Sequence, residues 1–515
     1  MRVLLVDIDS LRPDRLGTYG YSRNTSPTID AIAENGVRFD RCFTADSPCL
    51  PSRTSLATAR FGVKHGAVTH WGEGQWLDLH SRRGNGGDYP PDRPLSFRHL
   101  SDAGINTSTI TSFSKRHSAY HFSGSFRESI QPTPGMTDNG ATVTDTATAW
   151  IDDHADADDW LLHLNYWDVH HPYLGIDEFV DDVRESGPGA QWIDREVLAE
   201  QEGATGVRSR SLWPSPSQHE VDGKEYIDYG DWPMPVEIDT PEKAQHINDG
   251  YDASIRKVDA EVERLLSTLE RHGIRDETAI VVTADHGEAL GEHGIYAEHA
   301  LAHPPCQRVP MIVDVPGESE SAGSAVEDFV YQFDLLPTLC ELFGVETPSG
   351  WDAEPFTAAL RNEPFEGREY LVCGHGIYTF SRAVYEGDWM YARIHHPGVF
   401  SVPGLYNDPE LPNEGLEILH DLAEDPHLRE NLIGERPEIT RRLRSRIDEW
   451  REVNVNSAEA HGRDQLHEMA ATDGPYLYVD PNELADSYRE LGFATEQIER
   501  VADAADAFER RTFPH

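Results

Sequence analysis

Carboxylates stand at the ends of two apolar segments of this sequence. Asp7 and Asp9 close a short apolar segment near the start of the chain, and Asp285 and His286 directly follow another. Carboxylate oxygens suit hard divalent cations, and a histidine shifts some weight towards Mn²⁺ or Zn²⁺. Each pair alone also fits a turn or a helix cap. Two such pairs in one chain favour a metal site.

A cysteine lies between two prolines in the segment SPCLPSR, residues 47–53. A lone cysteine most often serves as a small core side chain. Here Cys49 is followed by Ser52 and Arg53 in the pattern C-x-P-S-R, and T-x-R comes a few residues later. The pattern resembles the signature of the type I sulfatases, a family of the alkaline phosphatase superfamily. In that family the cysteine is oxidised after translation to formylglycine, an aldehyde.

The resemblance extends to the carboxylates. Asp9 takes the family's leading metal-ligand position, and Asp285-His286 resembles the second metal pair. Many members carry another Asp directly after the first, where this chain has Ser10. Asp7 is a possible substitute that the family pattern does not assign. The implied metal ligands are therefore Asp9, Cys49, Asp285 and His286, with Asp7 and Ser10 as further candidates. The expected metal is Ca²⁺, with Mg²⁺ or Mn²⁺ as alternatives.

Three further matches concern an anionic substrate. Lys115 and His117 match the family's K-x-H, and His170 matches H-x-P. Their ordinary interpretations are a basic surface triplet and a histidine-rich turn. Nine residues before Arg308, where many members carry a sulfate-binding lysine, this chain has His299. Either His299 or the nearby His303 contacts the sulfate in place of the lysine, or the site prefers a different leaving group.

The resemblance also implies a mechanism. The hydrate of formylglycine supplies the nucleophile and forms a covalent sulfate ester, and His117 then accepts the proton whose loss expels sulfate. Arg53 and Lys115 orient the hydrate and the metal. Lys115, His170 and His299 contact the sulfate, and His170 or His299 is the leaving-group acid. A histidine that acts as the acid titrates nearer neutral pH than a lysine. We therefore expect the activity to change with pH near neutrality.

Two rival functions remain open. The first is a phosphonate or phosphate monoester hydrolase on the same scaffold, which the absent lysine favours. The second is a non-catalytic metal-binding relative, which would have no need for the set Cys49, Pro51, Ser52, Arg53, Lys115 and His117. The expected substrate is a small-molecule or carbohydrate sulfate ester, and the expected protein partner is a formylglycine-generating enzyme.

These side chains need strands to position them. Apolar runs at residues 3–8, 160–164, 278–283 and 309–313 predict buried strands, and residues 251–272 show helical periodicity. Helices alternating with buried strands are typical of a parallel α/β sheet. Residues 369–394 instead alternate like antiparallel strands. We therefore predict a large N-terminal α/β domain with a mostly parallel sheet flanked by helices, and a smaller C-terminal α+β domain with an antiparallel sheet.

Composition suggests where the domains divide. A length of 515 residues exceeds what one compact core usually holds. We predict a catalytic domain over residues 1–350, a smaller domain over 351–455 and an acidic helical tail over 456–515. Residues 71–93 and 186–239 are polar and read as insertions that shape a site or lack structure.

The charge balance excludes some partners. The chain has 44 basic and 91 acidic residues, a net charge of −47, and we find only five lysines. This surface repels nucleic acid and anionic lipid. Such acidity with so little lysine resembles proteins of salt-in halophiles, including haloarchaea. The five scattered cysteines form no disulfide framework, and neither a signal peptide nor a membrane span is recognisable, so a cytoplasmic protein is expected.

Overall fold

The computed structural model describes residues 1–70, 72–75, 77, 94–136, 138–203, 224–227, 232–396, 416–456, 462–472, 485, 486, 489 and 499. An eight-stranded sheet lies at the centre, in the order β13-β2-β12-β9-β1-β6-β4-β5. Only β12 runs antiparallel to its neighbours. Its strands are β1 (Arg2–Ile8), β2 (Val37–Phe43), β4 (Asn106–Ile110), β5 (Glu128–Ile130), β6 (Trp160–Tyr166), β9 (Thr278–Thr283), β12 (Met311–Asp314) and β13 (Ser324–Tyr331).

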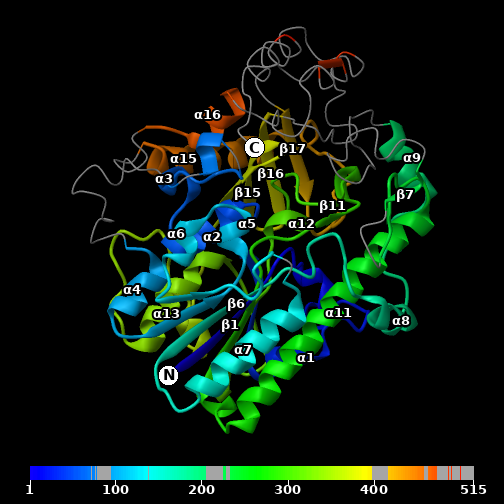
Figure 1. The fold of residues 1–515 in the computed structure, drawn as a ribbon. Helices are drawn as coiled ribbons and strands as arrows, with labels where there is room; N and C mark the ends of the chain where they lie inside the picture. Colours follow the sequence, from blue (N-terminus) through cyan, green and yellow to red (C-terminus); the bar gives the residue numbers. More distant parts are fainter. Residues whose placement is uncertain are drawn as a thin grey trace.

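Helices cover both faces of this sheet (Figure 1). One face carries α1 (Pro27–Asn35), α7 (Gly140–His154) and α11 (Pro241–Arg271), and the other carries α4 (Ser96–Asp102) and α13 (Leu335–Phe343). The helix predicted over residues 251–272 is the second half of α11, which begins ten residues earlier. Buried strands with helices on both faces are what the apolar runs predicted.

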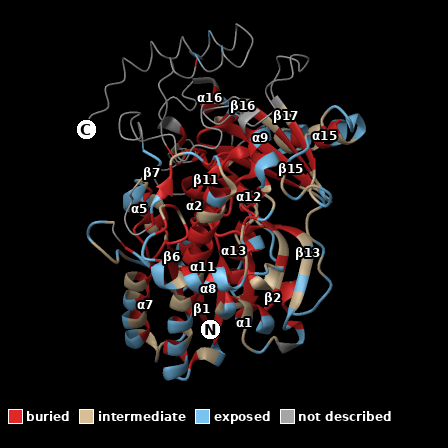
Figure 2. Ribbon diagram, turned by 90° about the vertical axis from the view of Figure 1, so that its right-hand side faces the viewer, coloured by how far each residue is buried: buried red, intermediate tan, exposed pale blue. Residues whose placement is uncertain are grey.

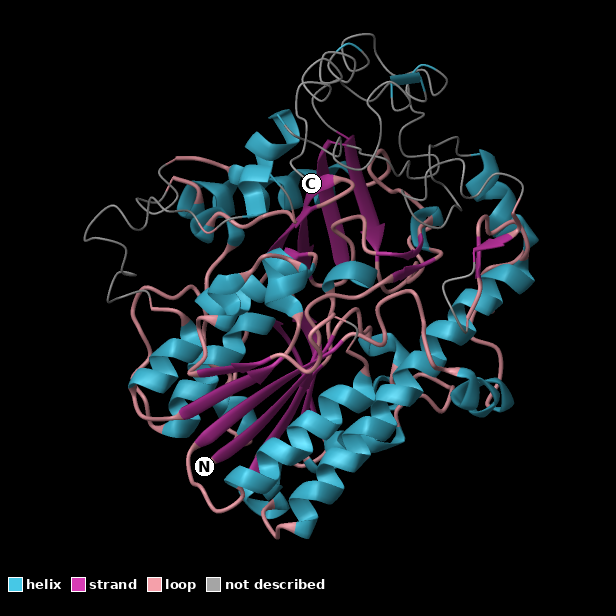
Figure 3. Ribbon diagram, viewed as in Figure 1, coloured by secondary structure: helices cyan, strands magenta, loops and turns pink. Residues whose placement is uncertain are grey.

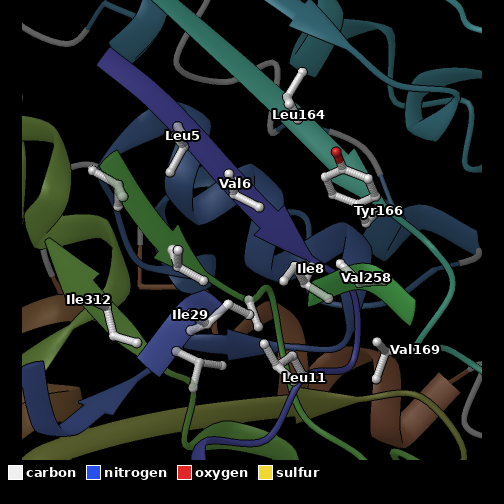
Figure 4. Packing of buried hydrophobic residues seen from close by; sticks show 14 of the residues in the cluster. Leu5, Val6, Ile8, Leu11, Ile29, Leu164, Tyr166, Val169, Val258 and Ile312 are labelled. Carbon is white, nitrogen blue, oxygen red and sulfur yellow. The ribbon is translucent and has the colours of Figure 1, made fainter. Parts of the chain in front are cut away.

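The main core lies between the sheet and its helices. Figure 4 shows Leu5 and Val6 of β1 packed near Leu164 of β6, with Ile29 of α1 and Val258 of α11 lying below them. All five side chains are almost completely buried. The central strands are buried on both faces, so their sequences are continuous apolar runs without alternation.

A second, five-stranded sheet follows in the chain, in the order β17-β16-β15-β14-β3. The strands β14 (Leu371–Gly376), β15 (Phe380–Glu386), β16 (Trp389–His396) and β17 (Leu416–Asp421) are antiparallel. The predicted antiparallel sheet is thus confirmed, and Figure 3 shows it stacked beyond one end of the central sheet. The helices α15 (Pro437–Asn454) and α16 (Gln465–Thr472) pack against it.

The two sheets are joined by a short strand and a buried helix. The strand β3 (Asp46–Ser47) leaves the N-terminal part of the chain and pairs with β14. All ten residues of the next helix, α2 (Cys49–Thr58), are buried, and Figure 2 shows this buried region between the two sheets. One hydrophobic cluster contains side chains from both sides of residue 350. The division into domains at that residue therefore stays a prediction.

The predicted insertions and tail are only partly within the described residues. The described part of 186–239 includes the helix α9 (Arg195–Gly203) and the two-stranded sheet of β7 (Tyr226–Ile227) and β8 (Met234–Pro235). The preceding helix is α8 (Asp177–Glu185). Most of residues 71–93 and nearly all of the predicted tail beyond α16 lie outside the described residues. Within the described ranges, no helix combines the length and apolar character needed to cross a membrane.

Candidate active site

Four neighbouring strands bring the predicted residues to one edge of the central sheet. The parallel strands lie in the order β9-β1-β6-β4, so their carboxyl ends share that edge. Asp9 follows β1, Asp285 follows β9, His170 follows β6 and His117 follows β4. Ligand sites of open α/β sheets lie at this edge, because the loops that leave the strands meet there.

Cys49 reaches the same place from α2. It is the first residue of that helix and is 1% exposed. Pro51 fits the first helical turn, since the first backbone N–H groups of a helix have no partner within the helix. The Cys49 Sγ atom lies 3.0 Å from Nε2 of His286. The helix therefore delivers the cysteine directly to the end of β9.

Four donor atoms converge at this point. Ligand atoms of Asp9, Cys49, Asp285 and His286 all lie within 4.8 Å of one another, and all four residues are buried. The Nδ1–H group of His286 donates to the Gly287 carbonyl oxygen at 2.9 Å, which leaves Nε2 with its lone pair facing the other donors. This is the arrangement that a metal-binding histidine requires.

Arg53 sets the charge balance of the cluster. Its Nε donates to Asp7 at 3.0 Å, and one terminal nitrogen donates to Asp9 at 2.9 Å and also to Asp285. Burial alone would raise the pKa of Asp9, but Arg53 and His286 hold that pKa below its usual range. Burial, reinforced by Asp9 and Asp7, raises the pKa of Asp285. One guanidinium thus faces three buried carboxylates, an excess of negative charge that suits a divalent cation.

The unmodified thiol is a poor nucleophile in this setting. Burial, together with the carboxylates of Asp9 and Asp285, raises the pKa of the Cys49 thiol far above its usual value. Because the thiolate is the reactive form of cysteine, these surroundings disfavour Cys49 as a nucleophile as long as no cation offsets the carboxylates.

Ser10 contacts the four-donor group directly, and Asp7 is linked to it through Arg53. Asp7 binds Arg53, and its Oδ2 lies 3.3 Å from Nε2 of the buried His163. The backbone N–H of Ser10 donates to Asp285, and its hydroxyl donates to Asp9 at 3.0 Å. The serine that replaces the family's usual aspartate therefore orients two of the donors.

Three histidines surround the cysteine. His299 lies against His286 with ring centroids 4.4 Å apart and against His170 at 5.3 Å, and ligand atoms of Cys49, His170 and His299 converge. The His170 Nδ1–H donates to the His171 carbonyl oxygen at 2.6 Å, which directs its other ring nitrogen away from the backbone. Burial and the neighbouring His170 lower the pKa of His299 to about 3.

His117 lies next to His70, which in turn contacts the start of α2. Its centroid is 4.7 Å from that of His70, and Nε2 of His70 accepts the Leu50 N–H at 3.3 Å. Burial, with a smaller effect from Arg53, lowers the pKa of His117 to about 3. The ring is therefore neutral at neutral pH, which is the form that can accept a proton.

Lys115 is not brought to this cluster. It lies on the short helix α5 (Phe113–Arg116), is exposed, and donates through Nζ to the Pro134 carbonyl oxygen. The helix turns Lys115 outwards, while His117, directly after its end, packs against His70, Phe113 and Trp167. His303 also lies elsewhere, with its ring nitrogens near Cys306 at 2.9 Å and His293 at 3.3 Å.

The sequence analysis missed several residues around the cluster. His163 lies in the buried strand β6 between two leucines, where an isolated polar residue was a usable signal. His70, Glu288 and Glu298 carried no motif that distinguishes them from other polar residues. Glu288 and Glu298 are brought together by the register of a short hairpin that the sequence does not reveal.

Fold and site together define an α/β protein with a buried cluster of carboxylates and histidines at the carboxyl edge of its central sheet. The family model described as Sulfatase matches residues 2–345, and the chain belongs to this family of hydrolases. It is 24% identical over 502 residues to an N-acetylglucosamine-6-O-sulfatase of Bacteroides thetaiotaomicron, covering 84% of this chain and 82% of that protein.

Solved structures agree on the fold. One, in complex with its substrate D-glucosamine-2-N,6-O-disulfate, matches with a TM-score of 0.65 at 18% identity, over 90% of this chain and 99% of that one. The phosphonate monoester hydrolase of Agrobacterium radiobacter matches with a TM-score of 0.62 at 18% identity, over 88% and 96% of the two chains.

Proposed function

We propose that this chain hydrolyses sulfate monoesters with a formylglycine derived from Cys49 and a bound divalent metal. The observation that carries the proposal is the position of Cys49, whose Sγ lies among the donor atoms of Asp9, Asp285 and His286. A metal at these donors and an oxygen nucleophile at position 49 would then be neighbours.

Asp9, Asp285, His286 and the modified side chain would hold the metal, and the excess of carboxylates over Arg53 fits its charge. When present, the metal neutralises anionic oxygens, and the hydrated aldehyde supplies the hydroxyl that attacks sulfur. Ca²⁺ suits the oxygen-rich set, with Mg²⁺ or Mn²⁺ as alternatives.

The other side chains divide the work of orientation and proton transfer. Arg53 holds the carboxylates in place and stacks near Phe113 and Trp167, at 4.9 and 5.4 Å from their ring centroids. His117, neutral at neutral pH, accepts the proton whose loss releases sulfate. His170 donates a proton to the departing alkoxide, while the neutral His299 contacts the sulfate. We assign Lys115 no contact with the substrate, because its Nζ is engaged with Pro134.

Burial also constrains the modification. Cys49 is 1% exposed inside a helix whose residues are all buried. A formylglycine-generating enzyme therefore needs the segment before the chain has folded. The substrate is a small-molecule or carbohydrate sulfate ester, in line with the names of the relatives.

The alternative is hydrolysis of phosphonate or phosphate monoesters. The similarity in fold to a phosphonate monoester hydrolase supports it, as does the histidine at position 299. Rates on matched sulfate and phosphonate monoesters with the same leaving group decide between the two.

The first test is the chemical state of position 49. We expect fragmentation of the tryptic peptide 42–53, from protein made in its native cells, to show an aldehyde at position 49. Cys42 lies in the same peptide and should remain a thiol, so it serves as an internal control. An unmodified thiol at position 49 in an active preparation would overturn the proposed nucleophile.

A further inference from the structure

A second group of donor atoms lies beside the one that contains Cys49. Ligand atoms of Glu288, Glu298 and His299 all lie within 4.8 Å of one another. Nδ1 of His299 is 3.8 Å from Oε1 of Glu288 and 3.9 Å from Oε2 of Glu298. These separations are too long for hydrogen bonds and leave room for an ion between the three groups.

A short hairpin builds this group. The strands β10 (Ala289–Leu290) and β11 (Tyr296–Glu298) are antiparallel, and Ala289 lies opposite Glu298. Glu288 directly precedes one strand, and His299 directly follows the other. The register of the hairpin therefore places both glutamates and the histidine at one end of it.

The group is buried, and three of its ligand atoms lack hydrogen-bond partners. Glu288, Glu298 and His299 are 0%, 1% and 4% exposed. Neither carboxylate oxygen of Glu288 has a hydrogen-bond partner, and the same is true of Nδ1 of His299. Glu298 differs, because its Oε2 accepts the backbone N–H of His299 at 3.2 Å and its carboxylate accepts a hydrogen bond from Tyr378. Within the described part of the chain, no arginine or lysine forms an ion pair with either glutamate. Two buried carboxylates without a cation are costly, because burial removes the water that would solvate them.

We propose that Glu288, Glu298 and Nδ1 of His299 bind a second divalent cation. Two carboxylates and one imidazole form a mixed oxygen and nitrogen set, which favours Mn²⁺ or Zn²⁺ over Ca²⁺. The set shares no residue with Asp9, Cys49, Asp285 and His286. His299 packs against His286, so the two ions would be near neighbours around the cysteine.

This second site goes beyond the proposed sulfate hydrolysis. Its occupancy can be measured by metal binding alone, without an assay of activity. The full-length protein is saturated with Ca²⁺ in molar KCl and then titrated with Mn²⁺, and the free Mn²⁺ is followed by its EPR signal. We expect one Mn²⁺ to bind per chain while the Ca²⁺ content stays constant. Pulsed EPR should detect one histidine nitrogen coupled to the bound Mn²⁺, a measurement that needs no variant.

The isosteric variants Glu288→Gln and Glu298→Gln locate the ion. Each should weaken Mn²⁺ binding at least tenfold and leave the Ca²⁺ content unchanged. Glu292→Gln is the matched control, since Glu292 is equally buried on the same segment but is bound to Arg12 at 2.9 Å. We expect it to keep the second ion. Thermal unfolding confirms that each variant is folded.

Three results would overturn the second site. The first is that no Mn²⁺ or Zn²⁺ binds beyond the first ion. The second is that the Glu288→Gln/Glu298→Gln double variant binds the second ion as well as the wild type does. The third is that bound Mn²⁺ shows no coupling to a nitrogen. None of them bears on formylglycine or on sulfate hydrolysis. Conversely, an unmodified Cys49 or an inactive protein would leave the Mn²⁺ count as it is.

Discussion

At the scale of single residues, the site is organised by one buried arginine. Arg53 binds Asp7, Asp9 and Asp285 at once, so a single guanidinium holds the ends of β1 and β9 together. The C-x-P-S-R spacing explains how: the arginine lies one helical turn after the cysteine, on the same side of α2. A lysine at position 53 would keep the charge but could not form this fork of hydrogen bonds.

The proton donor is tested by changing the leaving group. We expect His170→Asn to lower kcat on alkyl sulfates by about 10²–10⁴, the usual contribution of a general acid. On nitrophenyl sulfate the loss should be much smaller, because nitrophenolate leaves without a proton. Rates of both variant and wild-type enzyme are compared across a series of leaving groups.

His299→Asn is the control in the same series. A residue that contacts the sulfate but donates no proton should lower kcat/KM by a similar factor for all leaving groups. If His170→Asn shows this uniform loss and His299→Asn shows the graded one, the two roles are exchanged.

Motifs located most of the site because the chemistry demands particular residue types at fixed spacing. Cys49, Asp9, Asp285 and His286 were all found in this way, and the structure brings them together. The K-x-H match was a weaker guide, because it could not show that α5 turns Lys115 to the surface. Glu288 and Glu298 were missed because only the hairpin register brings them together.

At the scale of elements, the two-residue strand β3 joins the two sheets. Asp46 of this strand pairs with Gly374 of β14, and its carboxylate accepts the Gly62 N–H at 2.7 Å and the Ser55 hydroxyl at 3.3 Å. Burial raises the pKa of Asp46 to about 7. The folded protein therefore holds this proton more tightly than the unfolded chain does.

A pH dependence of stability follows from Asp46. Between about pH 4 and pH 7 the folded state binds more protons at this residue than the unfolded state, so its contribution to stability falls as pH rises through that window. The Asp46→Asn variant cannot titrate. We expect its stability relative to the wild type to rise by at most about 4 kcal/mol from pH 4 to pH 7 and to be constant above.

Denaturant unfolding of both proteins at several pH values measures this difference, because the other acids titrate in both and cancel. A difference that does not change between pH 4 and pH 7 would mean that the pKa of Asp46 is not raised in the folded protein.

Long elements were predictable and short ones were not. The apolar run at residues 278–283 coincides with β9, and the run at 3–8 lies within β1, since doubly buried strands need continuous apolar sequence. The strands β3 and β10 have two residues each, too few for any periodicity. These short elements nevertheless position Cys49 and Glu288, so the site was less predictable than the sheet that supports it.

At the scale of the whole molecule, the net charge of −47 is the dominant property. Its effect on stability depends on salt, because the Debye length falls from about 10 Å at 0.1 M to about 3 Å at 1 M. We expect the Tm to rise steadily with KCl as repulsion between surface acids is screened. Thermal unfolding in a KCl series checks this, and a Tm that falls or stays constant would contradict it.

The helix α8 allows the same idea to be tested locally. Asp181, Asp182 and Glu185 are exposed in its second half, where the negative end of the helix dipole disfavours acids. The variant D181N/D182N/E185Q should therefore be more stable than the wild type at low salt, by about 0.3–1 kcal/mol for each charge removed. In molar KCl this gain should vanish, since screening removes both the repulsion and the dipole effect. Denaturant unfolding at both salt concentrations measures the gain in stability. If the gain persists in molar KCl, its cause is helix propensity rather than charge.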